Sequence, residues 1–235
     1  MQTAVIAGVG PGLGESIARR FAAEGCALGL IARTEGYVEE LTADLPTDAV
    51  AAPANLAEPS DIEAAFDRIR GELGPVDVLV NHASAAGWTG LLDTDLDAYD
   101  RAYKVGPRAG FLCSQEAVKD MRAGAAAGED GTAGTIIFTG ATTSVRGREG
   151  AVGFSMAKFG SRGLAESMAR ELGPEGIHVA HVVIDGGILT PGVETDTPEE
   201  YLDPDAIADS YWHLVQQDRS AWTLELDLRP HVEDF

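Results

Sequence analysis

The sequence predicts an α/β fold: one domain in which a doubly wound parallel sheet of about seven strands carries helices on both faces. Short, nearly continuous apolar segments alternate with amphipathic helical patterns along the chain. This alternation is typical of parallel sheets that are buried on both sides. The first apolar segment, residues 3–7, runs into a glycine-rich turn and then a helical pattern. A length of 235 residues is enough for one such domain with a sizeable core.

The expected elements follow one another without an internal repeat or a long linker, so residues 1–235 are expected to form a single domain. The expected strands are residues 3–7, 27–32, 49–53, 77–81, 134–140, 177–184 and 222–226. The expected helices are residues 12–24, 35–43, 60–72, 96–122, 152–172 and 198–216. Small and polar residues at 124–134 predict a surface loop, and those at 186–205 predict a mobile flap over a substrate site.

Composition and charge exclude several classes of function. The chain is 45% hydrophobic and 23% charged, and it has no apolar run near the roughly 18 residues that a membrane span needs. A net charge of −21 argues against nucleic acid and anionic membranes as partners. Cys26 and Cys113 have no metal or redox spacing, so no metal site is expected. These features, with no signal-like N-terminus, favour a cytoplasmic protein.

The glycine-rich turn has the pattern of a phosphate site. Gly8, Gly10, Gly12 and Gly14 follow the first strand, and Leu13 begins the apolar face of a helix. Glycines in such a turn allow a tight bend, close approach of a pyrophosphate to the backbone, and close packing of the helix on the strand. The helix N-terminus adds free N–H groups and a partial positive charge. The turn therefore predicts a Rossmann fold that binds a dinucleotide.

The end of the second strand bears on which dinucleotide is bound. A carboxylate at this place usually holds the ribose 2′-hydroxyl of NAD. Here Ala32 ends the strand, and Arg33 and Thr34 follow it. A cation and a hydroxyl suit a 2′-phosphate. We therefore expect NADP(H) to be favoured over NAD(H).

Taken together, the motifs of this chain resemble the classical short-chain dehydrogenase/reductase family over nearly the whole length. They occur in the family's order, and they are Gly8-x3-Gly12-x-Gly14, the variant Asn81-His82-Ala83-Ser84 of an Asn-Asn-Ala-Gly segment, Ser155-Met-Ala-Lys158-Phe-Gly, Gly176-Ile-His-Val-Ala and Gly186…Thr190-Pro191. The resemblance implies an oxidoreductase that moves a hydride between a nicotinamide cofactor and a substrate.

The resemblance also implies a set of cofactor contacts. Asn55 would face the adenine, where the family usually has Asp, and Ile188 and Thr190 would contact the nicotinamide carboxamide. Lys158 would hydrogen-bond the nicotinamide ribose. The residues implied to bind the cofactor are Gly8, Gly12, Leu13, Gly14, Arg33, Thr34, Asn55, Leu56, Asn81, Ala83, Lys158, Gly186, Ile188 and Thr190.

The chain departs from the family where the chemistry is done. The family uses Asn, Ser, Tyr and Lys, with Tyr four residues before Lys: the phenol exchanges a proton with the substrate oxygen, Lys lowers the phenol pKa, and Ser holds the same oxygen. Here Lys158 is present, but Phe154 occupies the Tyr slot, Ala141 the Ser slot and Gly106 the Asn slot. No nearby tyrosine restores the pair. A phenyl ring cannot exchange a proton, so the family's usual mechanism cannot operate unchanged.

Several groups are conceivable replacements for the missing proton donor. Water, Lys158 or a hydroxyl of the loop that follows Ala141 could deliver the proton. The side chains considered are Thr142, Thr143, Ser144, Ser155, His82 and Asp185, although a structural role is the simpler explanation of each one. His178 and His181 are three residues apart on a strand, hence on opposite faces, and do not form a metal pair.

The pocket walls are expected to be largely apolar. They would come from residues 85–88, residues 144–148, the flap at 186–205 and the helix that carries Tyr211 and Trp212. These walls favour a small hydrophobic carbonyl or hydroxyl substrate. In addition, Arg146 and Arg148 could hold a carboxylate.

The sequence therefore leaves more than one function open. The first is an atypical NADP(H)-dependent oxidoreductase without the usual Tyr donor. The alternative is a catalytically silent NADP(H)-binding protein, acting as a sensor or partner subunit. Non-redox chemistry is disfavoured, because dehalogenases of this fold keep Ser and Tyr but lose the cofactor loop, which is the opposite pattern. The resemblance implies a homodimer or homotetramer, because in the family the helices expected at 96–122 and 152–172, which here carry small residues, pair with their copies.

Overall fold

A computed structural model describes residues 1–85, 87–124 and 132–233. The strands are β1 (Thr3–Ala7), β2 (Ala27–Ala32), β3 (Ala49–Pro53), β4 (Val78–Asn81), β5 (Gly134–Thr139), β6 (Ile177–Ile184), β7 (Gly187–Ile188), β8 (Tyr201–Leu202) and β9 (Glu225–Leu228). The helices are α1 (Leu13–Ala23), α2 (Glu35–Asp44), α3 (Pro59–Leu73), α4 (Leu96–Tyr103), α5 (Ala109–Gly124), α6 (Val152–Leu172) and α7 (Pro204–Val215). Short helical turns are η1 (Lys104–Arg108), η2 (Thr142–Ser144), η3 (Gly173–Glu175), η4 (Pro198–Glu200) and η5 (Arg219–Ala221).

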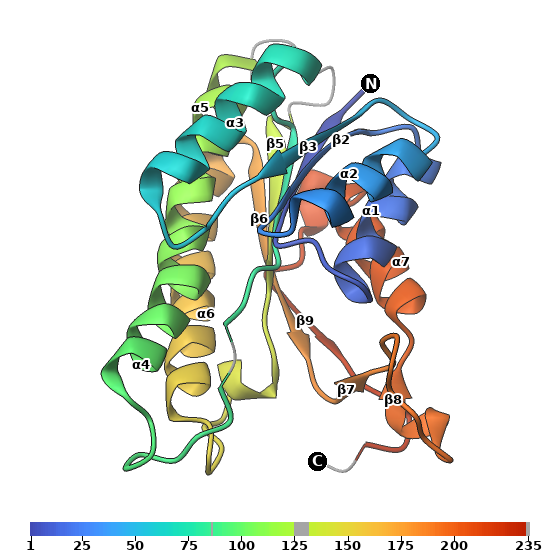
Figure 1. Ribbon diagram of the computed structural model, residues 1–235. Helices are drawn as coiled ribbons and strands as arrows, with labels where there is room; N and C mark the ends of the chain where they lie inside the picture. Colours follow the sequence, from blue (N-terminus) through green and yellow to red (C-terminus); the bar gives the residue numbers. More distant parts are fainter. Residues whose placement is uncertain (86, 125–131, 234–235) are drawn as a thin grey trace.

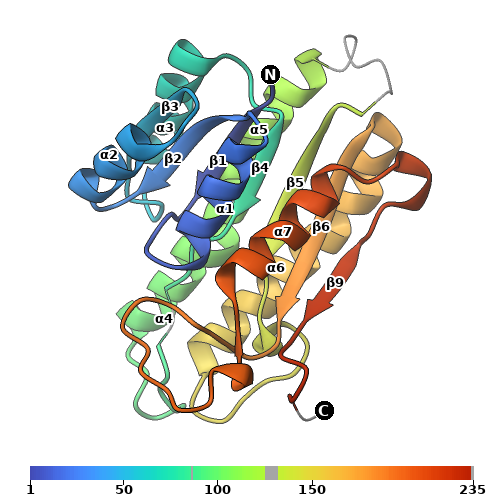
Figure 2. The ribbon, with the colours of Figure 1, turned by 90° about the vertical axis from the view of Figure 1, so that its right-hand side faces the viewer.

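Seven strands form one parallel sheet in the order β3-β2-β1-β4-β5-β6-β9. Helices α1, α2 and α7 cover one face, and α3, α4, α5 and α6 lie on the other (Figure 1). Figure 2 shows α1 and α7 side by side in front of the sheet, in agreement with their packing. The predicted doubly wound Rossmann fold with a sheet of about seven strands is therefore confirmed.

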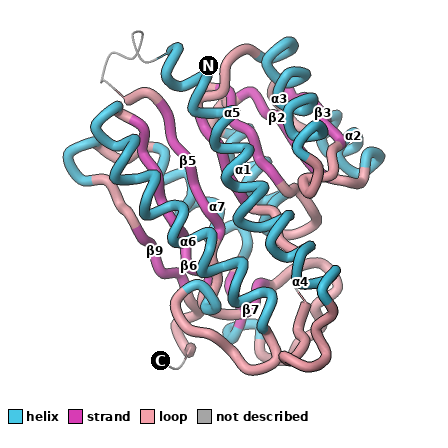
Figure 3. Tube along the Cα trace, turned by 90° about the vertical axis from the view of Figure 1, so that its left-hand side faces the viewer, coloured by secondary structure: helices cyan, strands magenta, loops and turns pink. Residues whose placement is uncertain are grey.

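The sheet is buried on both faces because its strands are apolar on both faces. On β1, the side chains of Ala4 and Ile6 enter the core under α1 and α7, while those of Val5 and Ala7 enter the core under α3 and α5. All five residues of β1 and all eight residues of β6 are buried. Such continuous apolar strands are what a parallel sheet between two helix layers requires. The long loops gather at the carboxyl ends of the strands (Figure 3).

The predicted single helix at 96–122 is wrong, because the chain is kinked at η1. Gly106 there has φ −85° and ψ −106°, which is not helical, and α4 and α5 lie on either side. The cause is Pro107, which lacks an N–H and disfavours the helical conformation in the residue before it. The kink brings Val105 and Gly106 toward the ends of the strands.

Two predictions near the C-terminus need correction. The helix expected at 198–216 begins only at Pro204, where Asp203 caps it, and the preceding residues form η4 and the short strand β8. The strand expected at 222–226 is β9, shifted to Glu225–Leu228. The shift arises because Thr223 is held by the side chains of Gln217 and His178 instead of by a neighbouring strand. Most of the loop expected at 124–134 lies outside the described residues.

Candidate functional site

A cleft of about 1320 Å³ opens at the carboxyl ends of the strands. It lies where the strand order reverses, because the chain returns after β3 to pair β4 with β1. Loops that leave neighbouring strands on opposite faces separate at such a point and form a binding crevice. The residues proposed from the sequence that line the cleft are Gly8, Leu13, Gly14, Arg33, Asn55, Leu56, Ala83, Ala141, Phe154, Lys158, Gly186, Ile188 and Thr190. Gly12, Thr34, Asn81 and Gly106 do not line it.

The glycine turn is packed against the segment that follows β4. Gly8 has φ +103°, and a Cβ there would lie 2.5 Å from the Ala83 backbone, so only glycine fits. A Cβ at Gly14 would lie 3.1 Å from Val9 Cα, which explains the close packing of α1 on the turn. No side chain among the described residues caps the start of α1. The first N–H groups of this helix therefore face the cleft without a side-chain acceptor, as an anion site requires.

Gly12 and Thr190 bring the segment 186–205 against the glycine turn. Gly12 has φ +107°, and a Cβ there would lie 2.5 Å from Thr190 Cγ2. The segment is further organised by the parallel pairing of β7 with β8. Thr190 thus lies over the turn at the mouth of the cleft. Thr34 is placed differently: it precedes α2 as its N-terminal cap residue.

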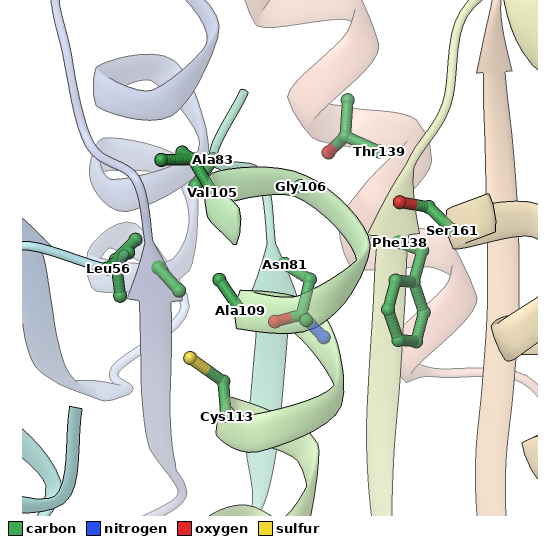
Figure 4. Close-up of a pocket in the computed structure, with 12 residues that line it drawn as sticks. Leu56, Asn81, Ala83, Val105, Gly106, Ala109, Cys113, Phe138, Thr139 and Ser161 are labelled. Atoms are coloured by element: carbon green, nitrogen blue, oxygen red, sulfur yellow. The ribbon is translucent and has the colours of Figure 1, made fainter. Parts of the chain in front are cut away.

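Asn81 and Gly106 border a second, much smaller cavity beneath the cleft (Figure 4). The Asn81 side chain is buried, and its Nδ2 donates a hydrogen bond to Ser114 Oγ at 3.2 Å. Leu56 and Ala83 line both this cavity and the cleft. The structure therefore gives Asn81 a supporting position under the cleft floor.

Lys158 is the best-defined polar group of the cleft. It projects from α6, is buried, and donates a hydrogen bond from Nζ to the Thr139 carbonyl at 2.7 Å. Its Nζ also lies 5.6 Å from the centroid of the Phe154 ring, within range of a cation–π contact. Burial lowers the pKa of Lys158 to about 8. This side chain can therefore change its charge near neutral pH.

The loop after Ala141 offers three hydroxyls in three different environments. Ser144 Oγ accepts a hydrogen bond from Ala141 N at 2.9 Å, and Thr142 Oγ1 donates one to Asp185 Oδ1 at 2.5 Å. Thr143 Oγ1 is buried and has no hydrogen-bond partner among the described residues. Thr142 and Thr143 line the cleft, whereas Ser144 does not. Of these three hydroxyls, that of Thr143 is therefore the one available to a ligand near Ala141.

His82 lines the cleft as part of a buried polar chain. Its Nδ1 lies 3.1 Å from Thr139 Oγ1, which lies 2.8 Å from the Tyr211 hydroxyl. Burial, with a smaller contribution from the Lys158 cation, lowers the pKa of His82 to about 4. Burial raises the pKa of Tyr211 above its usual range. Both groups are thus neutral at pH 7, and these hydrogen-bonded side chains hold His82 in a fixed position at the cleft.

The structure corrects the expected pocket walls. Tyr211 is fully buried behind Thr139, and Trp212 packs edge-on against Phe21 with ring centroids 5.3 Å apart, so neither lines the cleft. Arg146 is also outside it, 3.7 Å from Asp185 Oδ1. Trp88 does line the cleft, and its ring centroid lies 5.8 Å from that of Phe154. Ser155 Oγ accepts a hydrogen bond from Arg148 N at 3.4 Å and stays outside the lining.

Some lining residues carry no signal in the sequence. Ala98 and Arg101 reach the cleft from α4, and Glu233 reaches it from the C-terminal segment. Their contribution depends on how α4 packs after the kink at Pro107 and on the path of the chain after β9, and neither follows from a local pattern. Within the described residues, no group of three or more His, Cys, Asp or Glu could hold a metal ion. No helix in the described ranges is long and apolar enough to cross a membrane.

A Rossmann-type sheet with a glycine turn at its switch point defines a class of nucleotide-binding folds. The model of the short chain dehydrogenase family matches residues 2–200. The chain therefore belongs to this family, whose curated relatives are named dehydrogenases and reductases, and it is placed among the oxidoreductases.

Solved and curated relatives agree with this assignment. A short-chain dehydrogenase from Rhodopseudomonas palustris is 32% identical, with a TM-score of 0.84, covering 98% of this chain and 99% of that one. The carbonyl reductase [NADPH] 2 of Sus scrofa is 31% identical over 183 residues, which are 76% of this chain and 69% of that protein. A 3alpha-hydroxysteroid dehydrogenase from Mediterraneibacter gnavus is 28% identical over 86% of this chain and 80% of its own length.

Proposed function

We propose that this chain is an NADP(H)-dependent oxidoreductase that acts on a small hydrophobic carbonyl or hydroxyl substrate without the usual Tyr proton donor. The observation that carries the proposal is the position of Lys158, buried at the floor of a cleft that also contains the glycine turn. A buried cation is costly unless it is used or paired. We expect Lys158 to contact the nicotinamide ribose and the substrate oxygen.

The residues present fit a dinucleotide. The turn between Gly8 and Gly14 leaves open space at Gly10, where an added Cβ would meet nothing within 4 Å, beside the uncapped start of α1. These features suit a pyrophosphate. Arg33, with Thr34 next to it, would hold a 2′-phosphate, and Asn55 and Leu56 would border the adenine.

The choice between the two nicotinamide cofactors rests on Arg33. Its guanidinium has no hydrogen bond or ion pair with any described residue, and it lines the cleft one residue after β2. The carbonyl reductase of Sus scrofa carries NADPH in its name, whereas a 3-ketoacyl-(acyl-carrier-protein) reductase from Brucella melitensis, 25% identical with a TM-score of 0.87, was solved with NADH. Relatives thus use either cofactor, and the cation at position 33 favours NADP(H).

The proposed chemistry assigns different roles to Lys158 and Thr143. When bound, the reduced cofactor supplies a hydride to the substrate carbonyl carbon. Lys158 holds a proton below a pKa of about 8 and can stabilise or protonate the oxygen, directly or through water. Thr143, whose hydroxyl has no partner in the described residues, can donate a hydrogen bond to that oxygen. The rings of Trp88 and Phe154 would form an apolar wall of the cleft and favour a hydrophobic substrate.

Assembly into a homodimer or homotetramer through α4, α5 and α6 belongs to the same proposal. Tyr103, Phe111 and Phe159, on these helices, are 48%, 45% and 43% exposed. Aromatic side chains exposed on neighbouring helices are typical of an interface that a second copy covers.

Stopped-flow and steady-state fluorescence of NADPH test cofactor binding. A panel of diketones, aldehydes and aromatic ketones tests turnover. We expect micromolar NADPH binding and measurable oxidation with at least one carbonyl. Lys158→Met should reduce turnover at least tenfold. Lys119→Met, which removes an exposed cation on α5, is the matched control and should not change it. Absence of NADPH binding would overturn the proposal. Binding without turnover across the panel would favour the alternative, a catalytically silent cofactor-binding protein. The lack of a hydroxyl at Ala141 and Phe154 is consistent with that alternative.

A further inference from the structure

The charge of the cleft is opposite to the charge of the chain. Among the described lining residues, the cations are Arg33, Arg101, Arg148 and Lys158, and the acidic residue is Glu233. The whole chain has a net charge of −21. A cationic recess in a strongly acidic protein concentrates anions and repels them elsewhere. The bound ligands are therefore expected to be anionic.

The pairing of the arginines singles out the same recess. All arginines of the chain lie in the described residues, and the guanidinium groups of Arg33, Arg101 and Arg148 alone have no hydrogen bond or ion pair there. Each of these three lines the cleft. With acidic residues in more than twofold excess over basic ones, a partner is easily found on the surface. These three arginines are exposed where they line the cleft, and they have no acidic partner among the described residues there.

Arg101 and Arg148 come from segments that follow β4 and β5. Arg33 follows β2, which β1 and β4 separate from β5 in the sheet. Arg148 lies between η2 and α6, and its N–H reaches the side chain of Ser155, the neighbour of Phe154. Arg101 lies on α4, one turn after Ala98. Helix α4 packs through Tyr99 and Ala102 against Gly153 near the start of α6. Both arginines thus come from segments next to the N-terminal part of α6, which carries Phe154 of the Trp88–Phe154 ring pair.

We propose that Arg101 and Arg148 form an anion subsite and that the substrate is a hydrophobic carbonyl compound carrying a carboxylate. The planar guanidinium binds a carboxylate with two parallel hydrogen bonds, and the aromatic pair accommodates the apolar body. The glycine turn and Arg33 already supply groups for the phosphates of the cofactor, so these two cations are available to a second anion. This inference rests on the proposed function and specifies its substrate class.

Calorimetry with benzoylformate and its uncharged ethyl ester tests the subsite, on the chain alone and with saturating NADP⁺. The acid should bind at least tenfold more tightly than the ester, and added salt should weaken only the acid. Arg101→Gln and Arg148→Gln should each weaken binding of the acid about tenfold and leave the ester unchanged. Arg68→Gln, which removes an equally charged side chain on α3, is the control and should change neither.

Equal affinity for acid and ester would overturn the subsite, as would affinities for the acid that survive both substitutions within twofold. If the two variants weaken NADP⁺ and not the acid, the cations belong to the cofactor site and the inference is wrong. None of these readouts requires turnover. A failure of the proposed enzymatic function, seen as NADPH that binds without oxidation, is therefore distinguishable from a failure of the anion subsite.

Discussion

The ammonium of Lys158 lies 5.6 Å from the centroid of the Phe154 ring, four residues earlier on the same helix. The ring offers the cation a π face but no hydrogen-bond acceptor. One of the three ammonium protons is used by the Thr139 carbonyl at 2.7 Å. The remaining donor capacity is open to ligands in the cleft, such as ribose hydroxyls or a substrate oxygen.

The first prediction restores the missing hydroxyls. Phe154→Tyr together with Ala141→Ser should raise NADPH oxidation with an activated ketone by roughly 10²-fold, because a positioned acid contributes that much. The buried Lys158 beside residue 154 would lower the pKa of the new phenol. Steady-state kinetics on the single and double variants measure the effect. A double variant no faster than wild type would mean that residues 141 and 154 are misassigned.

The second prediction separates the contribution of the Phe154 ring to activity from that of the Lys158 cation. Phe154→Ala should retain more activity than Lys158→Ala, since the ring shapes the pocket while the lysine contacts ligands. The measurement is kcat and KM for the same ketone with both variants. Equal losses, or a greater loss at Phe154, would contradict the role given to Lys158.

The third prediction concerns pH and Lys158. Its folded pKa of about 8 lies below the usual 10.5, so between these values the unfolded chain keeps a proton that the folded chain has released. Stability therefore rises with pH in that window, and the buried cation destabilises the fold below it. NADPH affinity should fall as pH rises through about 8, because the cation is lost. Fluorescence titrations across this range should show the step in wild type and no step in Lys158→Met.

The fourth prediction concerns acid stability and His82. Burial gives it a pKa of about 4, against 6.5 in the unfolded chain. Below pH 6.5, His82 is protonated in the unfolded chain but stays neutral in the folded chain. The free energy of unfolding therefore decreases as the pH falls from 6.5 to about 4. His82→Asn should therefore gain about 2 kcal/mol relative to wild type between pH 7 and pH 5. Urea unfolding at both values tests this, and an unchanged difference between the two proteins would refute it. His178 and His181, whose pKa values burial also lowers, remain in both proteins.

The fifth prediction concerns cofactor choice. Arg33→Ala should weaken NADPH by roughly 10- to 100-fold and leave NADH nearly unchanged, because a charge-assisted contact to the 2′-phosphate is lost. Calorimetry with both cofactors measures the ratio, with Arg68→Ala as the control. If wild type binds NADH as tightly as NADPH or more tightly, the assigned preference for NADP(H) is wrong.

The sequence predicted the sheet and the turn well because both depend on local pattern. Residues 3–7 and 27–32 are continuous apolar runs bounded by glycine or a charged residue, and both form strands with those limits. The kink at Gly106 was missed although Pro107 is visible in the sequence, since the apolar pattern continues across it. The helical periodicity favours one continuous helix, whereas Pro107 favours a break, and here the proline determines the structure.

The candidate site was predicted less completely than the fold. Motif residues that directly follow strands, such as Arg33 and Ala83, line the cleft, because the end of a strand fixes their place. Tyr211 was wrongly expected as a wall, because the sequence does not tell which face of α7 meets Thr139. Arg101 was missed because its contribution depends on how α4 packs against α6.

The position of β1 in the interior of the sheet also has a consequence during synthesis on the ribosome. β1 leaves the exit tunnel before the other strands of this sheet, yet it becomes an inner strand, flanked by β2 and then by β4. A nascent chain can therefore assemble β1, β2 and β3 with their helices early, but it then presents an open edge of β1. That edge is closed only when β4 emerges, and the second wall of the cleft follows with β5 and β6. The glycine turn and Arg33 are therefore made early, but the complete ligand site is assembled only late in translation.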